Sequence, residues 1–131
     1  QDLDYIKNYI ELQKLRLTHK ESVIFEVEGN PADLRISPLI LINFIENAFK
    51  YGVIDEASDP VIISIKVEQQ TLFLNVENTI SKEVNPETEK SEIGLKNTKK
   101  RLDYFYTNHY KLAIHNDLSK FIVELKIFLN D

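Results

Sequence analysis

The sequence predicts an α+β fold, a two-layer sandwich in which helices pack on one face of a mixed β-sheet. Three observations support this: segments with helical periodicity alternate with segments of period two, and short turns join most of the latter as hairpins. The third is size, because 131 residues with 43% hydrophobic side chains suffice for a single core.

Two helices are predicted in the first half of the chain. Residues 3–18 repeat apolar side chains every three or four positions, as a helix with one buried stripe does. Residues 37–50 begin at Ser37-Pro38, where serine caps free amides and proline suits the first turn, and end before Gly52. This second helix is apolar around most of its circumference, which predicts a buried position.

A third helix is expected over residues 95–105, directly after Gly94. Residues 79–93 before it are rich in Glu, Lys, Ser, Asn and Pro, and we expect a long mobile loop there.

The strands are expected where apolar and polar residues alternate. These segments are 23–28, 61–68, 72–77, 110–115 and 121–129. Gln69-Gln70 supplies a tight turn between the second and third strands, so these two form a hairpin.

Composition excludes several classes of function. The formal charge of −5 is the opposite of what a nucleic-acid-binding domain needs. Cysteine is absent, and the three histidines lack the spacing of a zinc site, so ordinary surface histidines are expected. No apolar stretch approaches the ~20 residues of a membrane-spanning helix. The chain also contains no methionine, so we expect it to be a piece of a longer protein.

The predicted second helix carries one polar stripe, formed by Asn43, Glu46, Asn47 and Lys50. One interpretation is the solvated edge of a buried helix. The other is a ligand site, because Asn and Glu oxygens suit Mg²⁺ and lysine complements phosphate. The spacing alone leaves both open.

Three weaker signals lie further along the chain. Asn78 continues the core-facing row of its strand, either bonding to its own turn or offering a partner to a ring amide. Gly94, before a helix, allows backbone amides to approach an anion. The basic group Lys96, Lys99, Lys100 and Arg101 is either a solvated helix face or a screen for phosphate charge.

Together these features resemble the ATP-binding catalytic domain of sensor histidine kinases, in the LytS-like branch of the gyrase, Hsp90, histidine kinase and MutL superfamily. The stretch from Ser37 to Gly52 resembles that family's N box, and Gly94-Leu95-Lys96-Asn97 resembles its second glycine box. The resemblance implies the Bergerat-type ATP-binding fold over residues 21–131. Residues 1–20 would then be the end of the helical linker from the phosphoacceptor region.

The resemblance also implies roles for particular residues. Asn47 would ligate Mg²⁺ and Asn43 would support the metal and phosphate region, while Glu46 matches the position of the general base. Lys50 and the backbone amides of Gly94 and Leu95 would contact the phosphates of ATP. Tyr51 and Asn78 would contact the adenine.

Two departures from the family pattern are visible. The first glycine box usually reads Asp-x-Gly-x-Gly, whereas this chain has Asn78-Thr79-Ile80-Ser81-Lys82. Glu92 also replaces the glycine that usually precedes Ile-Gly-Leu.

The resemblance implies a protein-histidine kinase that transfers the γ-phosphoryl group of ATP to a histidine upstream of this chain. Its partners would be its own phosphoacceptor helices, a response regulator and a second subunit, with no nucleic acid. The expected location is the cytoplasmic side of a bacterial inner membrane, reached through preceding segments. A noncatalytic signalling or dimerisation domain with a weakened nucleotide site is the alternative; an interaction domain of unrelated function is a third.

Overall fold

The computed structural model describes residues 2–15, 23–29, 38–51, 60–79, 87–116 and 119–128. These ranges contain three helices and five strands, in the order α1 (Asp2–Leu15), β1 (Val23–Glu28), α2 (Pro38–Tyr51), β2 (Val61–Glu68), β3 (Thr71–Thr79), α3 (Glu87–Phe105), β4 (Tyr110–Asn116) and β5 (Lys120–Phe128).

The strands form one mixed sheet in the order β1-β2-β3-β5-β4. β1 pairs with β2 in parallel, with Val23 opposite Val61, and every other neighbouring pair is antiparallel. The single parallel pair follows from the chain path, because α2 carries the chain back along the sheet between β1 and β2.

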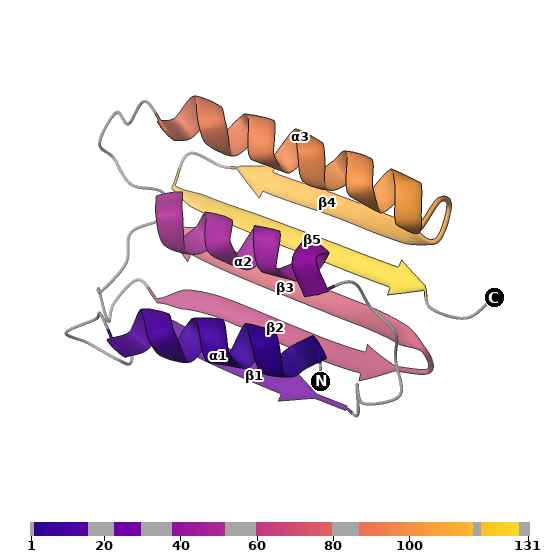
Figure 1. The fold of residues 1–131 in the computed structure, drawn as a ribbon, viewed down its shortest axis with the longest axis horizontal. Coiled ribbons are helices and arrows are strands. Elements are labelled where there is room, and N and C mark those ends of the chain that lie inside the picture. The colour runs from indigo at the N-terminus through magenta and orange to yellow at the C-terminus, as the bar shows by residue number, and fades with distance from the viewer. Residues whose placement is uncertain are drawn as a thin grey trace.

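All three helices cover the same face of this sheet, with α1 over β1 and β2, α2 over the central strands and α3 beside β4 (Figure 1). The core lies between the two layers. Strand residues of one parity point into it, among them Ile63, Leu74 and Leu125, each at most 2% exposed. The predicted α+β sandwich with helices on one face of a mixed sheet is therefore confirmed.

Helix α1 packs into the same core as the rest of the chain. Its Ile6 and Ile10 are at most 1% exposed, and the ring of Tyr9 meets that of Phe49 in α2 edge to face, with centroids 5.9 Å apart. The helix predicted over 3–18 is observed from Asp2 to Leu15, and residues 16–18 lie outside the described part of the chain.

The loop predicted over residues 79–93 was wrong at residue 79 and over 87–93, while residues 80–86 lie outside the described part of the chain. Helix α3 begins at Glu87, so residues 87–93 are helical rather than loop, and Thr79 belongs to β3. The polar composition that indicated a loop also suits a helix start, because acidic residues are common in the first turn of a helix. A single interior glycine costs a helix only about 1 kcal/mol, which leaves Gly94 tolerable inside α3.

The strands agree closely with the sequence pattern. β1 and β2 match their predicted bounds, while β4 extends one residue further and β5 begins one residue earlier than expected. The hairpin turn is the predicted Gln69-Gln70, and both residues have positive φ, at 51° and 61°. This is the backbone of a type I′ turn, which suits the twist of the two strands.

The junction between α3 and β4 is held by side chains as well as by backbone. The Tyr110 hydroxyl on β4 donates a hydrogen bond to the Asp103 carboxylate on α3. This bond, together with burial and the carboxylate charge, raises the pKa of Tyr110 to about 12 from its ordinary value of 10.0. The contact ties the last turn of α3 to an edge strand.

We predict that this bond stabilises the protein at neutral pH and that the stabilisation is lost at alkaline pH. The pKa of Tyr110 is higher in the folded protein than in the unfolded chain. The contribution of Tyr110 to the free energy of unfolding is therefore complete below pH 10 and is lost as the pH rises towards about 12. Tyr110→Phe should unfold more easily than the parent at pH 8, and the difference should shrink above pH 10. Denaturant unfolding across this range measures it, with the 80% exposed Tyr104 changed to Phe as control. A parent-to-variant difference that stays constant with pH would contradict the assignment.

Candidate functional site

Three elements converge at one end of the molecule. Figure 1 shows the C-terminal half of α2, the end of β3 and the N-terminal half of α3 at the same end of the two layers. Helices α2 and α3 pack against one another, and α2 rests on β3. The fold therefore brings together most of the residues that the sequence singled out.

The polar stripe of α2 lies on the side of the helix away from the sheet. Leu41 and Ile45 are at most 1% exposed, and their positions lie nearly opposite Asn43 on the helix circumference. Asn43, Glu46 and Asn47 are half-buried, which leaves them accessible but partly shielded. Glu46 is the one acidic residue of α2.

Asn78 lies on the helix-facing side of β3, near its end. It is 4% exposed and follows three fully buried apolar residues on the same side of the strand, Leu72, Leu74 and Val76. Its side-chain nitrogen donates a 3.3 Å hydrogen bond to the carbonyl oxygen of Thr79. The local contact that the sequence suggested is therefore present, with the amide group held in an apolar setting.

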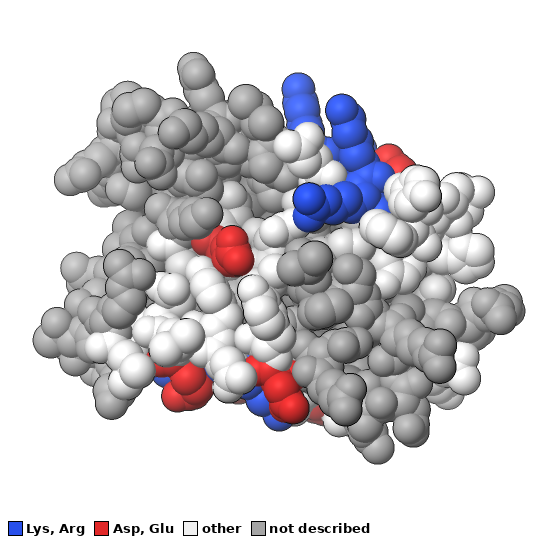
Figure 2. Space-filling view, in the orientation of Figure 1, with Lys and Arg blue, Asp and Glu red and all other residues white. Residues whose placement is uncertain are grey.

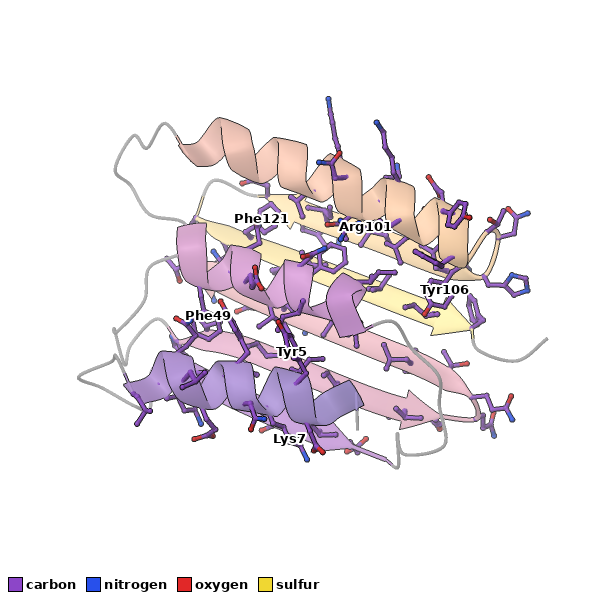
Figure 3. All side chains as sticks on the ribbon, viewed as in Figure 1. Tyr5, Lys7, Phe49, Arg101, Tyr106 and Phe121 are labelled. Atoms are coloured by element: carbon purple, nitrogen blue, oxygen red, sulfur yellow. The ribbon has the colours of Figure 1, made fainter. Side chains whose placement is uncertain are left out.

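Phe121 on β5 is the cross-strand neighbour of Asn78. Its ring is half-buried against the core and lies between α2 and α3 in Figure 3. Asn78 therefore has an aromatic neighbour at the same end of the sheet.

The structure puts Gly94 inside α3 rather than before it. Within a helix each amide bonds to the carbonyl four residues earlier, so the amides of Gly94 and Leu95 serve the helix here. The expectation that they stand free at a helix start was wrong for this arrangement. Leu95 is half-buried against the core. Lys50 and Tyr51 belong to α2, but their side chains lie outside the described part of the chain.

The sequence assigned no role to Thr98 of α3, whereas Arg101 belongs to the basic group that was considered as a screen for phosphate charge. Thr98 is 3% exposed, and it interrupts the apolar row of Leu95 and Leu102 that faces the core. A hydroxyl group in an otherwise apolar row is the sequence feature that could have pointed to Thr98. Arg101 lies on the side of α3 towards α2 (Figure 3), seven positions after Gly94 and so on the same helix face.

The basic residues of α3 differ in their surroundings. Their side chains gather along the outer edge of the helix layer in Figure 2, as a solvated face would. Arg101 is the member whose position suits contact with a ligand over α2. The expectation for His109 and His115 is confirmed, since both are exposed. His19 lies outside the described residues.

The oxygen atoms of the α2 stripe are of the kind that Mg²⁺ prefers. Asn43 and Asn47 offer amide oxygens and Glu46 a carboxylate, all hard donors one helical turn apart. Across the described ranges no three His, Cys, Asp or Glu side chains cluster as a metal cage. One carboxylate with neutral oxygens fits an ion that takes its remaining ligands from phosphate and water.

No described helix is both long and apolar enough to cross a membrane. The sequence matches no protein-family model and no curated protein.

The fold does match solved structures. The nucleotide-free catalytic domain of the histidine kinase ThkA is 17% identical, with a TM-score of 0.58 over 97% of this chain and 93% of that one. The histidine kinase AdeS of Acinetobacter baumannii is 18% identical, with a TM-score of 0.63 over 99% of this chain and 64% of that one. The histidine kinase domain of the E. coli osmosensor EnvZ is 13% identical, with a TM-score of 0.54 over 92% and 83%. The chain thus has the fold of histidine kinase catalytic domains.

Thr98 gives a stability test of the buried side of α3. No buried side-chain oxygen or nitrogen among the described residues lacks a hydrogen-bond partner, so its hydroxyl is satisfied. We predict that Thr98→Val lowers the free energy of unfolding by about 1–3 kcal/mol, because the partner loses its bond in a buried setting. Thr71→Val at the start of β3 is the matched control and should change it by less than about 0.5 kcal/mol. Equal effects in denaturant unfolding would refute the role given to Thr98.

Proposed function

We propose that this chain is the ATP-binding catalytic domain of a LytS-like sensor histidine kinase. The observation that carries the proposal is the polar stripe of α2, a helix otherwise buried in the core, at the end of the molecule where Asn78 and α3 meet it. The shared fold with ThkA and AdeS supports the same class.

Each site residue has a role in this proposal. Asn47 offers its side-chain oxygen to Mg²⁺, and Asn43 supports the metal and phosphates from one turn earlier. Lys50 and Arg101 supply positive charge to the phosphates. Asn78 and Tyr51 recognise the adenine, with Asn78 accepting a hydrogen bond from its amino group.

Gly94 and Leu95 contact phosphate only if the first turns of α3 release their amides. Asn78, in contrast, is already at the site. We therefore assign adenine recognition to Asn78 on the sheet, and contact with the phosphates to the first turns of α3.

Bound Mg-ATP would supply the transferable phosphoryl group and its charge compensation. Catalysis of phosphoryl transfer rests mainly on positioning and electrostatics, which suits a site of amide, carboxylate and basic side chains. Glu46 accepts or polarises a proton on the attacking imidazole, as a general base does. Its half-buried position over α2 leaves it accessible to a histidine brought by another domain.

The acceptor histidine would lie upstream, with residues 1–20 as the end of the linker. A response regulator is the expected next partner, and ThkA has been solved in complex with the response regulator TrrA. We further propose a homodimeric, membrane-attached parent protein with this domain in the cytoplasm.

A second function is favoured by one observation. Because α3 begins at Glu87 and uses the amides of Gly94 and Leu95 internally, a phosphate would meet fewer free donors than the glycine box implies. A noncatalytic signalling or dimerisation domain with weak nucleotide binding would have this arrangement. Nucleotide titration separates the two functions.

Calorimetric titration with Mg-ATP provides the first test. The parent should bind, and Asn47→Ala should weaken binding about tenfold or more, because removing one ligand to a charged group costs roughly 1.5–3 kcal/mol. Asn8→Ala, an exposed asparagine on α1, is the matched control and should bind as the parent does. Absence of binding by the parent at millimolar nucleotide would assign the chain to the noncatalytic function.

Asn78→Asp tests adenine recognition. A carboxylate accepts a stronger hydrogen bond than an amide, so affinity for Mg-ATP should rise roughly fivefold to tenfold. The same charge in a 4% exposed position should lower the melting temperature of the free protein. Titration and melting curves are measured on the same samples. If Asn78→Asp leaves the affinity for Mg-ATP unchanged, Asn78 is not part of the site.

A further inference from the structure

The face of the sheet opposite the helices holds a second feature. We call it the open face, meaning the strand side chains that point away from α1, α2 and α3; no described helix covers it (Figure 1). A groove of about 500 Å³ lies on it across β2, β3, β5 and β4. Small side chains line it at both sides, Ser64 on β2 and Ala113 on β4.

One row of side chains across this groove is basic. The strand register sets Lys66 on β2 opposite Phe73 on β3, then Lys126 on β5, then Lys111 on β4. Lys111 and Lys126 are direct cross-strand partners. Like charges directly opposite each other destabilise a sheet, so this pair opposes folding. In a chain with net charge −5, such a concentration of lysine favours a role in recognition.

The two ends of the row differ in charge. The Lys66 ammonium lies 3.5 Å from carboxylate oxygens of both Glu28 and Glu68, whose charges raise its pKa. That end is compensated. Next to the other end, which is Lys111, the Lys126 ammonium lies over the Phe73 ring, 5.1 Å from its centroid.

An acidic residue on the same side of β5 as Lys126 pairs with a histidine. Glu124 precedes Lys126 by two positions on β5 and so shares its face, but a carboxylate oxygen of Glu124 lies 3.5 Å from Nε2 of His115. His115 lies opposite Ile122, one row further from the lysines. The positive charge of Lys111 and Lys126 therefore stays available at the β4–β5 end of the groove.

An apolar row runs beside the groove. Ile24 on β1 and Ile62 on β2 are cross-strand partners, and Ile122 on β5 lies in the same row beyond Glu77 of β3. The Glu77 carboxylate lies 3.2 Å from the Lys120 ammonium, and Ile24 is 38% exposed. Rows of one face are spaced about 7 Å apart along a strand, which is also the spacing of alternate residues in an extended peptide. The open face thus offers apolar and basic contacts at intervals that an extended segment matches.

We propose that the open face is a docking surface for an extended, acidic segment of a partner protein. Its carboxylates pair with Lys111 and Lys126, and its apolar side chains lie against Phe73 and the isoleucine row. Charge complementarity selects this occupant, and the groove lies on the other side of the sheet from the α2 stripe. The proposal is independent of nucleotide binding.

The test uses a short peptide with glutamate at one position and leucine four positions later, so that both side chains point to the same side of an extended chain. It is titrated into isotope-labelled protein and followed by amide chemical shifts. We expect shifts confined to β2, β3, β4 and β5. The double variant Lys111→Gln/Lys126→Gln should raise the dissociation constant about tenfold or more, as loss of charged contacts does. Lys7→Gln/Lys14→Gln on α1 removes the same charge and should bind as the parent does.

Lys111→Gln alone keeps the contact between Lys126 and Phe73 and should melt at or above the parent temperature, since a repulsion is removed. That result separates weaker binding from damage to the fold. Equal affinity in both double variants, or shifts confined to the helices, would overturn the proposal. So would identical shifts with inorganic phosphate, which indicate a simple anion site, or shifts that depend on protein concentration alone, which indicate a second copy on this face.

Discussion

The burial of α2 is the constraint on which the rest of the structure depends. Every described apolar side chain of this helix is at most 6% exposed, and burying one such side chain contributes roughly 1.5–3 kcal/mol. That burial requires the sheet beneath the helix and α1 and α3 at its sides. One narrow strip of α2 then remains for polar residues, so packing decides where Asn43, Glu46 and Asn47 can lie.

The sequence predicted the sheet well because its signals are local. Alternation along 23–28 and 61–68 reports burial on one face directly, and Gln69-Gln70 is short enough to permit only a hairpin. The start of α3 could not be read in the same way. Residues 87–93 have few apolar side chains, so periodicity carried no signal, and glutamates that suit a loop also suit a helix start.

In the candidate site, too, local patterns were predictable and contacts between distant segments were not. The α2 stripe was predictable because its members are neighbours on one helix, whereas Thr98 and Arg101 join it only through the packing of α3 against α2. The paired lysines of the open face also needed the register, since Lys111 and Lys126 lie on different strands. The sheet thus separates two chemistries, a mixed polar site on the helix side and a basic groove behind it.

Binding of a metal-bound nucleotide over α2 is the central claim, and paramagnetic relaxation tests it most directly. Mn²⁺ in place of Mg²⁺ broadens amide signals near the ion, so titration of isotope-labelled protein with Mn-ATP locates the site independently of affinity. The signals of Asn43, Glu46 and Asn47 should broaden first, followed by those near Asn78. Broadening centred on the open face, or none over α2 at saturating nucleotide, would contradict the assignment.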